Sequence, residues 1–369
     1  MTQHDYKQTA YYLIYLIRCV LHNKVPAQEK LNKIDLSQLY EVAKDHSLTT
    51  IVAFALESVG IQDERFLQAK AKTIRRAIYF KIERTEILSD LEKAGIWYMP
   101  LKGIIISELY PKESMREMAD NDILFDSSRI DDIKQIMNNR GFTMEHDDSG
   151  HDLAFMKKPI YNFEMHTDLF GVGHYERFNQ YYENVKDRLT KDSTNDFGFH
   201  FSAEDFYIFM IAHEYKHFYY AGTGLRSLID TYIYLNHYHN ELDWNYINNE
   251  IKALGIEEYE KQSRELSMKL FNGEDLNSDD KRLLDNYIFA GTFGNDNIRI
   301  KNGIKKNSNS KVRYIMSRLF ISQPTIEKSY PLFFKYKFLQ PVLPIYRLIK
   351  SITNHRTRIV NELKTIMQK

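Results

Sequence analysis

Apolar residues recur at helical spacing along the first quarter of the chain. Residues 10–21 are almost continuously apolar, and residues 36–59 repeat apolar positions with a period near 3.6, which predicts amphipathic helices. Residues 69–94 carry charged side chains along one face, and Gly95 follows them, as glycine commonly does just beyond a helix. We therefore expect a helical N-terminal region, bounded at residues 1–75, and a long helix that leads out of it.

From residue 96 onward the pattern changes to short apolar stretches separated by turns and helices. Residues 96–103 predict a strand that runs into a glycine turn, and residues 115–125 predict a strand that ends in Ile-Leu-Phe. Residues 161–169 alternate between polar and apolar side chains, which is typical of a half-buried strand. These features predict an α+β fold with a small mixed sheet. The regions that we expect after the first are a core at residues 76–200, a helical domain at 201–300 and a basic C-terminal helical region with aromatic residues and prolines at 301–369.

Two aspartates stand at the start of the second of these strands. Because alternate side chains of a strand share a face, Asp120 and Asp122 should point the same way. Neighbouring carboxylates repel each other unless a cation lies between them, and Mg²⁺ prefers oxygen ligands. Glu164 belongs to the polar face of the alternating strand and would supply a third ligand if both strands faced one cleft. Taken alone, either motif is more typical of a strand face exposed to water.

Charge is unevenly distributed along a chain whose formal net charge is zero. Residues 301–369 contain 15 Lys and Arg residues but only two acidic residues, Glu327 and Glu362. This asymmetry suggests an anionic partner for the tail, such as a phosphorylated acceptor, a nucleic acid or an anionic membrane surface. A basic surface packed on an acidic body explains it equally well.

The cysteine content and the hydropathy of the chain bear on its cellular location. Cys19 is the only cysteine, so no disulfide can form within the chain. No apolar run approaches the roughly 18–20 residues that a transmembrane helix requires. We expect a cytoplasmic protein without a transmembrane segment.

Several short motifs along the chain occur together in one known family. In combination they resemble an uncharacterised nucleotidyltransferase family of the polymerase-β-like superfamily, and the resemblance covers most of the chain. The motifs of the core are Leu101-Lys102-Gly103, Leu109-Tyr110-Pro111, Arg116, Asp120-x-Asp122-Ile123-Leu124 and Glu164-x-His166. Those of the later helices are His213-x-x-Lys216-His217, Gly224-Leu225-Arg226 and Asp230.

The resemblance implies a polymerase-β-like nucleotidyltransferase core embedded in N- and C-terminal helical regions. It implies that Asp120, Asp122 and Glu164 are catalytic and bind Mg²⁺ or Mn²⁺. The expected reaction moves a nucleoside monophosphate from an NTP such as ATP to an unknown acceptor and releases pyrophosphate. The residues expected around the cleft, as nucleotide or acceptor contacts, are Lys102, Gly103, Arg116, His166, Lys216, His217, Arg226 and Asp230.

Two residues depart from the family pattern. Asn121 stands where an apolar residue is usual between the aspartates, which predicts that this part of the strand is less buried. Ile104 follows Gly103 where the wider superfamily has serine, so one phosphate contact would be missing or made by the backbone alone. Both departures keep open an alternative function, that of a catalytically degenerate protein of the same fold that binds nucleotide and acts in regulation.

His213-Glu214-x-x-His217 offers a second alternative, a zinc hydrolase. Two histidines at i and i+4 can bind Zn²⁺ while the glutamate acts as general base, and His237 or Glu241 would supply a third ligand. Lys216 would place an ammonium group beside that metal, which disfavours the site. A hydrogen-bonded pair of histidines packed on a helix is the simpler interpretation of the motif.

Overall fold

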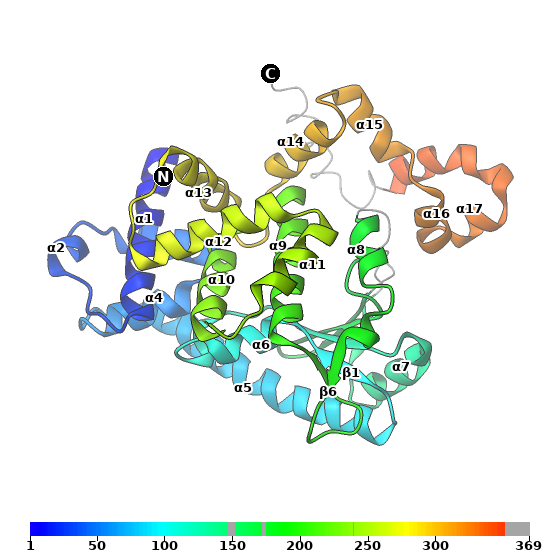
Figure 1. The fold of residues 1–369 in the computed structure, drawn as a ribbon, viewed down its shortest axis with the longest axis horizontal. Coiled ribbons are helices and arrows are strands. Elements are labelled where there is room, and N and C mark those ends of the chain that lie inside the picture. Colours follow the sequence, from blue (N-terminus) through cyan, green and yellow to red (C-terminus); the bar gives the residue numbers. More distant parts are fainter. Residues whose placement is uncertain (146–151, 172–174, 239, 351–369) are drawn as a thin grey trace.

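Helices enclose a small mixed sheet in the computed structural model, which describes residues 1–145, 152–171, 175–238 and 240–350 (Figure 1). The N-terminal helices are α1 (Gln3–Leu21), α2 (Gln28–Leu31), α3 (Leu36–Asp45), α4 (Thr49–Glu57) and α5 (Glu64–Lys93). The central elements are β1 (Tyr98–Pro100), α6 (Lys102–Leu109), η1 (Glu113–Met115), β2 (Asn121–Phe125), η2 (Ser127–Arg129), α7 (Ile130–Asn139), β3 (Thr143–Met144), β4 (Asp152–Lys157), β5 (Tyr161–His166), α8 (Glu176–Tyr181), η3 (Val185–Arg188), β6 (Leu189–Lys191) and β7 (Phe199–Phe201). The later helices are α9 (Ala203–Tyr220), α10 (Leu225–Tyr238), α11 (Trp244–Leu254), α12 (Glu257–Asn272), α13 (Ser278–Ala290), α14 (Asp296–Lys306), α15 (Lys311–Leu319), α16 (Gln323–Ser329), α17 (Pro331–Lys335) and η4 (Lys337–Val342).

The five-stranded sheet has the order β1-β2-β5-β4-β3. Strands β2 and β5 run parallel, and the other neighbouring strands are antiparallel, so the sheet is mixed as predicted. The register places Asp122 of β2 directly beside Glu164 of β5. The two predicted strands that carry carboxylates are therefore neighbours at the centre of the sheet.

The two faces of the sheet differ in character. Ile123, Phe125, Phe163 and Met165 are buried on one face, where they share an apolar cluster with residues of α5 and α7. The side chains between them in sequence point to the other face, as strand geometry requires. Glu164 and its neighbours on that second face are only partly buried, so the alternation predicted for this strand is confirmed.

Asn121 contradicts the prediction that the strand is less buried between its aspartates. Its side chain is completely buried, and its Oδ1 accepts a hydrogen bond of 2.8 Å from Nη1 of Arg84 on α5. A buried amide is stable only when its polar atoms find partners. The long helix α5 satisfies the amide oxygen, whereas the buried Nδ2 of Asn121 has no hydrogen-bond partner among the described residues.

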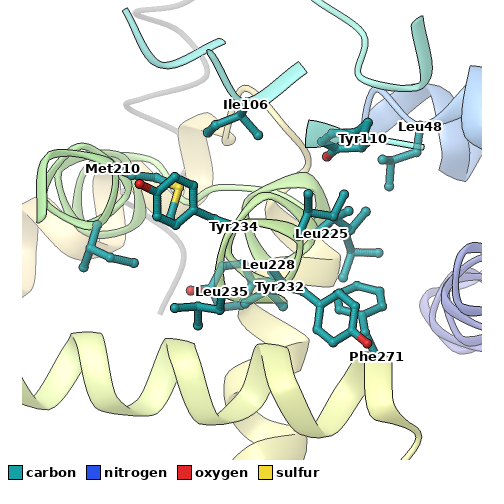
Figure 2. Close-up of a cluster of buried hydrophobic side chains, with 14 of the residues drawn as sticks. Leu48, Ile106, Tyr110, Met210, Leu225, Leu228, Tyr232, Tyr234, Leu235 and Phe271 are labelled. Atoms are coloured by element: carbon teal, nitrogen blue, oxygen red, sulfur yellow. The ribbon is translucent and has the colours of Figure 1, made fainter. Parts of the chain in front are cut away.

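Helix α10 runs through the centre of the main apolar core (Figure 2). Nearly every residue from Leu225 to Leu235 is buried, which is expected of a helix that is enclosed on all sides. Tyr232 packs against Phe271 of α12, with ring centroids 5.3 Å apart. Polar residues on α10 are therefore held on a rigid support.

The same core joins helices from α1 to α13. The predicted regional limits after residues 75, 200 and 300 fall inside α5, β7 and α14, respectively. The division of the chain into these four regions stays a prediction.

The C-terminal helices α15 to α17 project from the rest of the molecule (Figure 1). Large apolar side chains are exposed here, including Val312 on α15, Leu332 on α17 and Phe338 on the following η4. The end of the predicted basic region, residues 351–369, lies outside the described residues. Across the described part of the chain, every helix is too short or too polar to cross a membrane.

Candidate active site

Strand pairing brings two carboxylates and an imidazole together. Asp122 lies beside Glu164 in the parallel pair of strands, and His166 lies two residues further along β5 on the same face. His166 Nε2 is 3.3 Å from Asp122 Oδ1 and 3.9 Å from Glu164 Oε2. Each side chain offers one ligand atom within 4.8 Å of the other two, and all three are partly exposed. This arrangement could hold a divalent cation that enters from solvent.

The structure adds a second candidate role for His166 to the one that the sequence predicts. The sequence suggests a nucleotide or acceptor contact, whereas the structure places the imidazole among the candidate metal ligands. The signal was present in the chain, because residues two apart on a strand share a face. The alternating pattern of residues 161–169 thus already places His166 on the polar face of Glu164, and its contact with nucleotide or acceptor stays a prediction.

Asp120 lies immediately before β2 and is not part of this three-residue set. Burial, and next the negative charge of Asp122, raise the pKa of Asp120 to about 6, although Arg226 and Arg116 oppose the shift. The site therefore disfavours a second carboxylate charge unless a cation compensates it.

Replacing Asp120 by asparagine is expected to stabilise the metal-free protein at pH 7.5 by about 1–3 kcal/mol, since one pKa unit corresponds to about 1.4 kcal/mol. The folded protein holds the Asp120 proton more tightly than the unfolded chain, so this group makes stability fall as the pH rises from about 4 to about 6. Urea unfolding in EDTA would measure the difference, which should shrink toward zero as the pH approaches 4. A variant less stable than the wild type at pH 7.5 would contradict the prediction.

Arginines from two helices hold the backbone that leads to the aspartates. Arg226 Nη1 of α10 donates to the carbonyl of Glu117 over 2.8 Å. Arg76 of α5 donates through Nη2 to the carbonyl of Ala119. Together with Arg84, these contacts fix the segment that leads into β2. Arg226 thus has a positioning contact, and its predicted contact with nucleotide stays a prediction.

Arg116 and Asp230 form a buried ion pair. Two hydrogen bonds of 2.9 Å join the guanidinium to the two carboxylate oxygens, and Tyr110 donates a third hydrogen bond of 2.8 Å to Asp230. Burial alone would raise the pKa of Asp230, but the Arg116 charge holds it below its ordinary value. The pair ties the loop before β2 to helix α10, at positions that sequence analysis assigns to the nucleotide site.

Lys102 and Gly103 form the first turn of α6, not the glycine turn that the sequence predicts. A Cβ on Gly103 would lie 3.1 Å from Arg116 Nη1, so the close approach of this guanidinium favours glycine here. Burial lowers the pKa of Lys102 to about 8, with a further contribution from Arg116 and Arg226 and partial compensation by Asp230 and Glu214.

Helix α9 presents two histidines towards the site. Lys102 Nζ is 3.4 Å from His213 Nδ1, and the Nε2 atoms of His213 and His217 are 3.3 Å apart. Burial lowers the pKa of His213 well below its ordinary value, and the charge of Lys102 adds to the effect. Lys216, on the same helix, lies with its Nζ 5.7 Å from the ring centroid of Phe170.

Residues 32–272 match a protein family described as uncharacterised nucleotidyltransferase. The match covers more than half of the chain and contains all the residues described above for the site. The chain belongs to this nucleotidyltransferase family. Comparisons with curated proteins and with solved structures found no match. Membership confirms the resemblance seen in the sequence and supports a general nucleotidyltransferase activity with a nucleotide substrate.

The geometry within this nucleotidyltransferase-family protein argues against the zinc-hydrolase alternative. Glu214 points away from the two histidines into the core, where Oε1 accepts hydrogen bonds from Tyr259 (2.9 Å), Tyr287 (2.8 Å) and Ser263 (3.2 Å). It is therefore not placed to act as general base beside a metal on His213. Among the described residues, the metal-ligand group that forms is the one on β2 and β5.

Proposed function

We propose that this protein transfers a nucleoside monophosphate from an NTP to an acceptor hydroxyl, with Mg²⁺ or Mn²⁺ held at the junction of β2 and β5. The observation that carries the proposal is the meeting of Asp122, Glu164 and His166 within 4.8 Å, beside Asp120 with its raised pKa. Carboxylate oxygens suit hard divalent cations. When bound, such an ion would offset the triphosphate charge and stabilise the leaving pyrophosphate.

The carboxylates have distinct proposed roles. Asp120 and Asp122 would hold the cation, and Glu164, on the neighbouring strand, would complete its site and accept the proton of the acceptor hydroxyl. In the reaction, the acceptor oxygen forms a bond to the α-phosphorus, and the bond between that phosphorus and the oxygen bridging to the β-phosphorus breaks. Pyrophosphate takes the bonding electron pair, and the hydroxyl proton passes to the carboxylate.

Lys102 is proposed to face the triphosphate from the first turn of α6. Its pKa of about 8 leaves it largely protonated at neutral pH, and a neighbouring polyanion would raise that pKa further. Backbone N–H groups at the start of a helix also favour phosphate oxygens. These two features would compensate for the phosphate contact that is lost because this chain has Ile104 where the wider superfamily has serine.

The acceptor is proposed to be anionic. Residues 301–369 carry 15 basic residues against two acidic ones, and basic surfaces attract and orient anionic partners. A phosphorylated acceptor would meet this requirement.

Thermal unfolding with each NTP would test the proposal. With Mg²⁺ or Mn²⁺ present, the wild type should be stabilised by about 2.7 kcal/mol at a nucleotide concentration 100 times the dissociation constant. The stabilisation should disappear in Asp120→Asn/Asp122→Asn and persist in Asp131→Asn, a control whose side chain is 99 % exposed on α7. Failure of every NTP to stabilise the wild type would refute nucleotide binding. Binding without pyrophosphate release would instead identify the degenerate, regulatory alternative.

A further inference from the structure

A cavity of about 400 Å³ lies between the N-terminal helices α3 to α5 and the segment that precedes β2. Two aromatic residues, Tyr40 and Phe80, and two acidic residues, Glu113 and Glu117, line the cavity. Its volume is in the range of small-molecule pockets. The basic residues that line it are Lys44, Arg65, Lys72, Arg76, Arg84 and Arg116.

Both acidic side chains in the wall are already engaged. Glu117 Oε1 accepts hydrogen bonds from the Thr49 hydroxyl (2.6 Å) and the Thr50 backbone (2.8 Å). Glu113 Oε2 pairs with Lys81 at 3.0 Å. The donors to Glu117 are neutral, so this carboxylate keeps its charge. Arg65 pairs with Asp63 at 2.6 Å and Arg116 with Asp230 at 2.9 Å. Among the described residues, the basic side chains of the cavity without an ion-pair partner are those of Lys44, Lys72, Arg76 and Arg84.

Two of those basic residues are arginines that form no ion pair with any carboxylate of the described residues. Arg84 is only 8 % exposed, and its Nη1 donates to the neutral Asn121 side chain. Arg76 donates to the Ala119 carbonyl, while its buried Nε has no hydrogen-bond acceptor. Burial lowers the pKa of both guanidinium groups. Asp120 acts on Arg76, and Glu108 and Glu113 act on Arg84, only from beyond ion-pair distance and only partly offset the effect of burial. Removing a cation from water without a close counter-charge is unfavourable, and an anion in the cavity would relieve this imbalance.

We propose that this cavity is a second anion site, which binds a phosphorylated small molecule. Arginine forks match the geometry of phosphate oxygens. Four cations without an ion-pair partner among the described residues, against the single carboxylate of Glu117, favour a ligand with at least two negative charges. The partly exposed ring of Tyr40 would pack against the organic part of the ligand, whereas Phe80 is buried beneath the Arg76 guanidinium, 4.9 Å from its ring centroid.

The second anion site is separate from the proposed metal site. Asn121 and Asp122 are consecutive on β2 and so point to opposite faces of the sheet. Arg84, which lines the cavity, contacts Asn121, whereas Asp122 belongs to the metal-ligand group. Because Arg76 binds the carbonyl of the residue before Asp120, an occupied cavity would fix the segment that carries the aspartates. Anion binding here does not depend on transferase activity.

Titration of the intact protein with inorganic pyrophosphate in EDTA, by calorimetry at constant ionic strength, would test the proposal. EDTA suppresses metal-dependent binding at the aspartates. The charge-reversal variant Lys44→Glu/Lys72→Glu alters two exposed side chains at the mouth, so the fold should be retained. We expect its affinity to fall at least tenfold.

Two controls locate the bound pyrophosphate. Lys252→Glu reverses an exposed charge on α11, which takes no part in lining the cavity, and should bind as the wild type does. Lys102→Ala removes the cation proposed for the nucleotide site and should also leave the affinity unchanged. The proposal is overturned if the wild type fails to bind, if the double variant binds equally well, or if Lys102→Ala abolishes binding.

Discussion

Replacing Asp122 by asparagine is expected to reduce pyrophosphate release on the order of 10³-fold or more, the scale on which enzymes lose rate when a group that stabilises transition-state charge is removed. Asp122 lies next to both other residues of the candidate metal site. It is beside Glu164 in the strand register, and its Oδ1 is 3.3 Å from His166 Nε2. An amide would keep the shape of the side chain but lose the charge needed to hold a divalent cation.

The fold should survive this change, because the Asp122 side chain is 30 % exposed and lies at the edge of the apolar core. Release of pyrophosphate from each NTP with Mg²⁺, with water in place of the acceptor if necessary, would measure the rate. Asp131→Asn serves as the matched control, and its melting temperature should equal that of the wild type. The melting temperature of Asp122→Asn should be no lower, because the substitution removes the charge that repels Asp120. An Asp122→Asn enzyme with wild-type turnover would refute the proposed site.

Replacing Asp230 by leucine is expected to lower the free energy of unfolding by about 3–5 kcal/mol, the usual effect of removing one partner of a buried ion pair. The Arg116 and Asp230 side chains are only 6 % and 3 % exposed, so the variant would leave a guanidinium in the core without a counter-charge. Tyr110 would lose its hydrogen-bond acceptor as well. Urea unfolding would measure the loss.

The double variant Arg116→Met/Asp230→Leu removes both charges, and so distinguishes the effect of an uncompensated charge from the loss of other contacts. If the uncompensated charge causes the loss, removing both partners should restore most of the stability. The pH dependence gives an independent test, because the folded-state pKa of Asp230 is lowered. Its contribution should be complete above pH ~4, the unfolded-state pKa, and be lost as the pH falls through the folded-state value. Equal stability of Asp230→Leu and the wild type would show that the pair contributes nothing.

Local patterns along the chain were sufficient to predict the centre of the sheet. Alternation in residues 161–166 identifies β5 and its polar face, because a strand buried on one side must alternate. The aspartate pair followed by Ile123 marks the start of β2 in the same way. Neither inference needs knowledge of distant parts of the chain.

Contacts between distant segments were not predictable in this way. The burial of Asn121 depends on Arg84, which lies 37 residues earlier on α5, where no sequence pattern singles it out. The pairing of Arg116 with Asp230 joins residues 114 positions apart. Glu214 points away from the two histidines because three hydroxyl groups of α12 and α13 donate hydrogen bonds to its carboxylate in the core. Such partners are known only after the helices have been placed.

The shared core has a consequence for how this chain can be shortened. The family segment, residues 32–272, begins after α1 and ends before α13. Yet Leu13 of α1 is fully buried, and Tyr287 of α13 supplies one of the hydroxyl groups that solvate Glu214. A truncated protein restricted to residues 32–272 would expose one side of the core and leave a buried carboxylate short of a donor. The autonomous folding unit of this chain is therefore wider than the segment that its family shares.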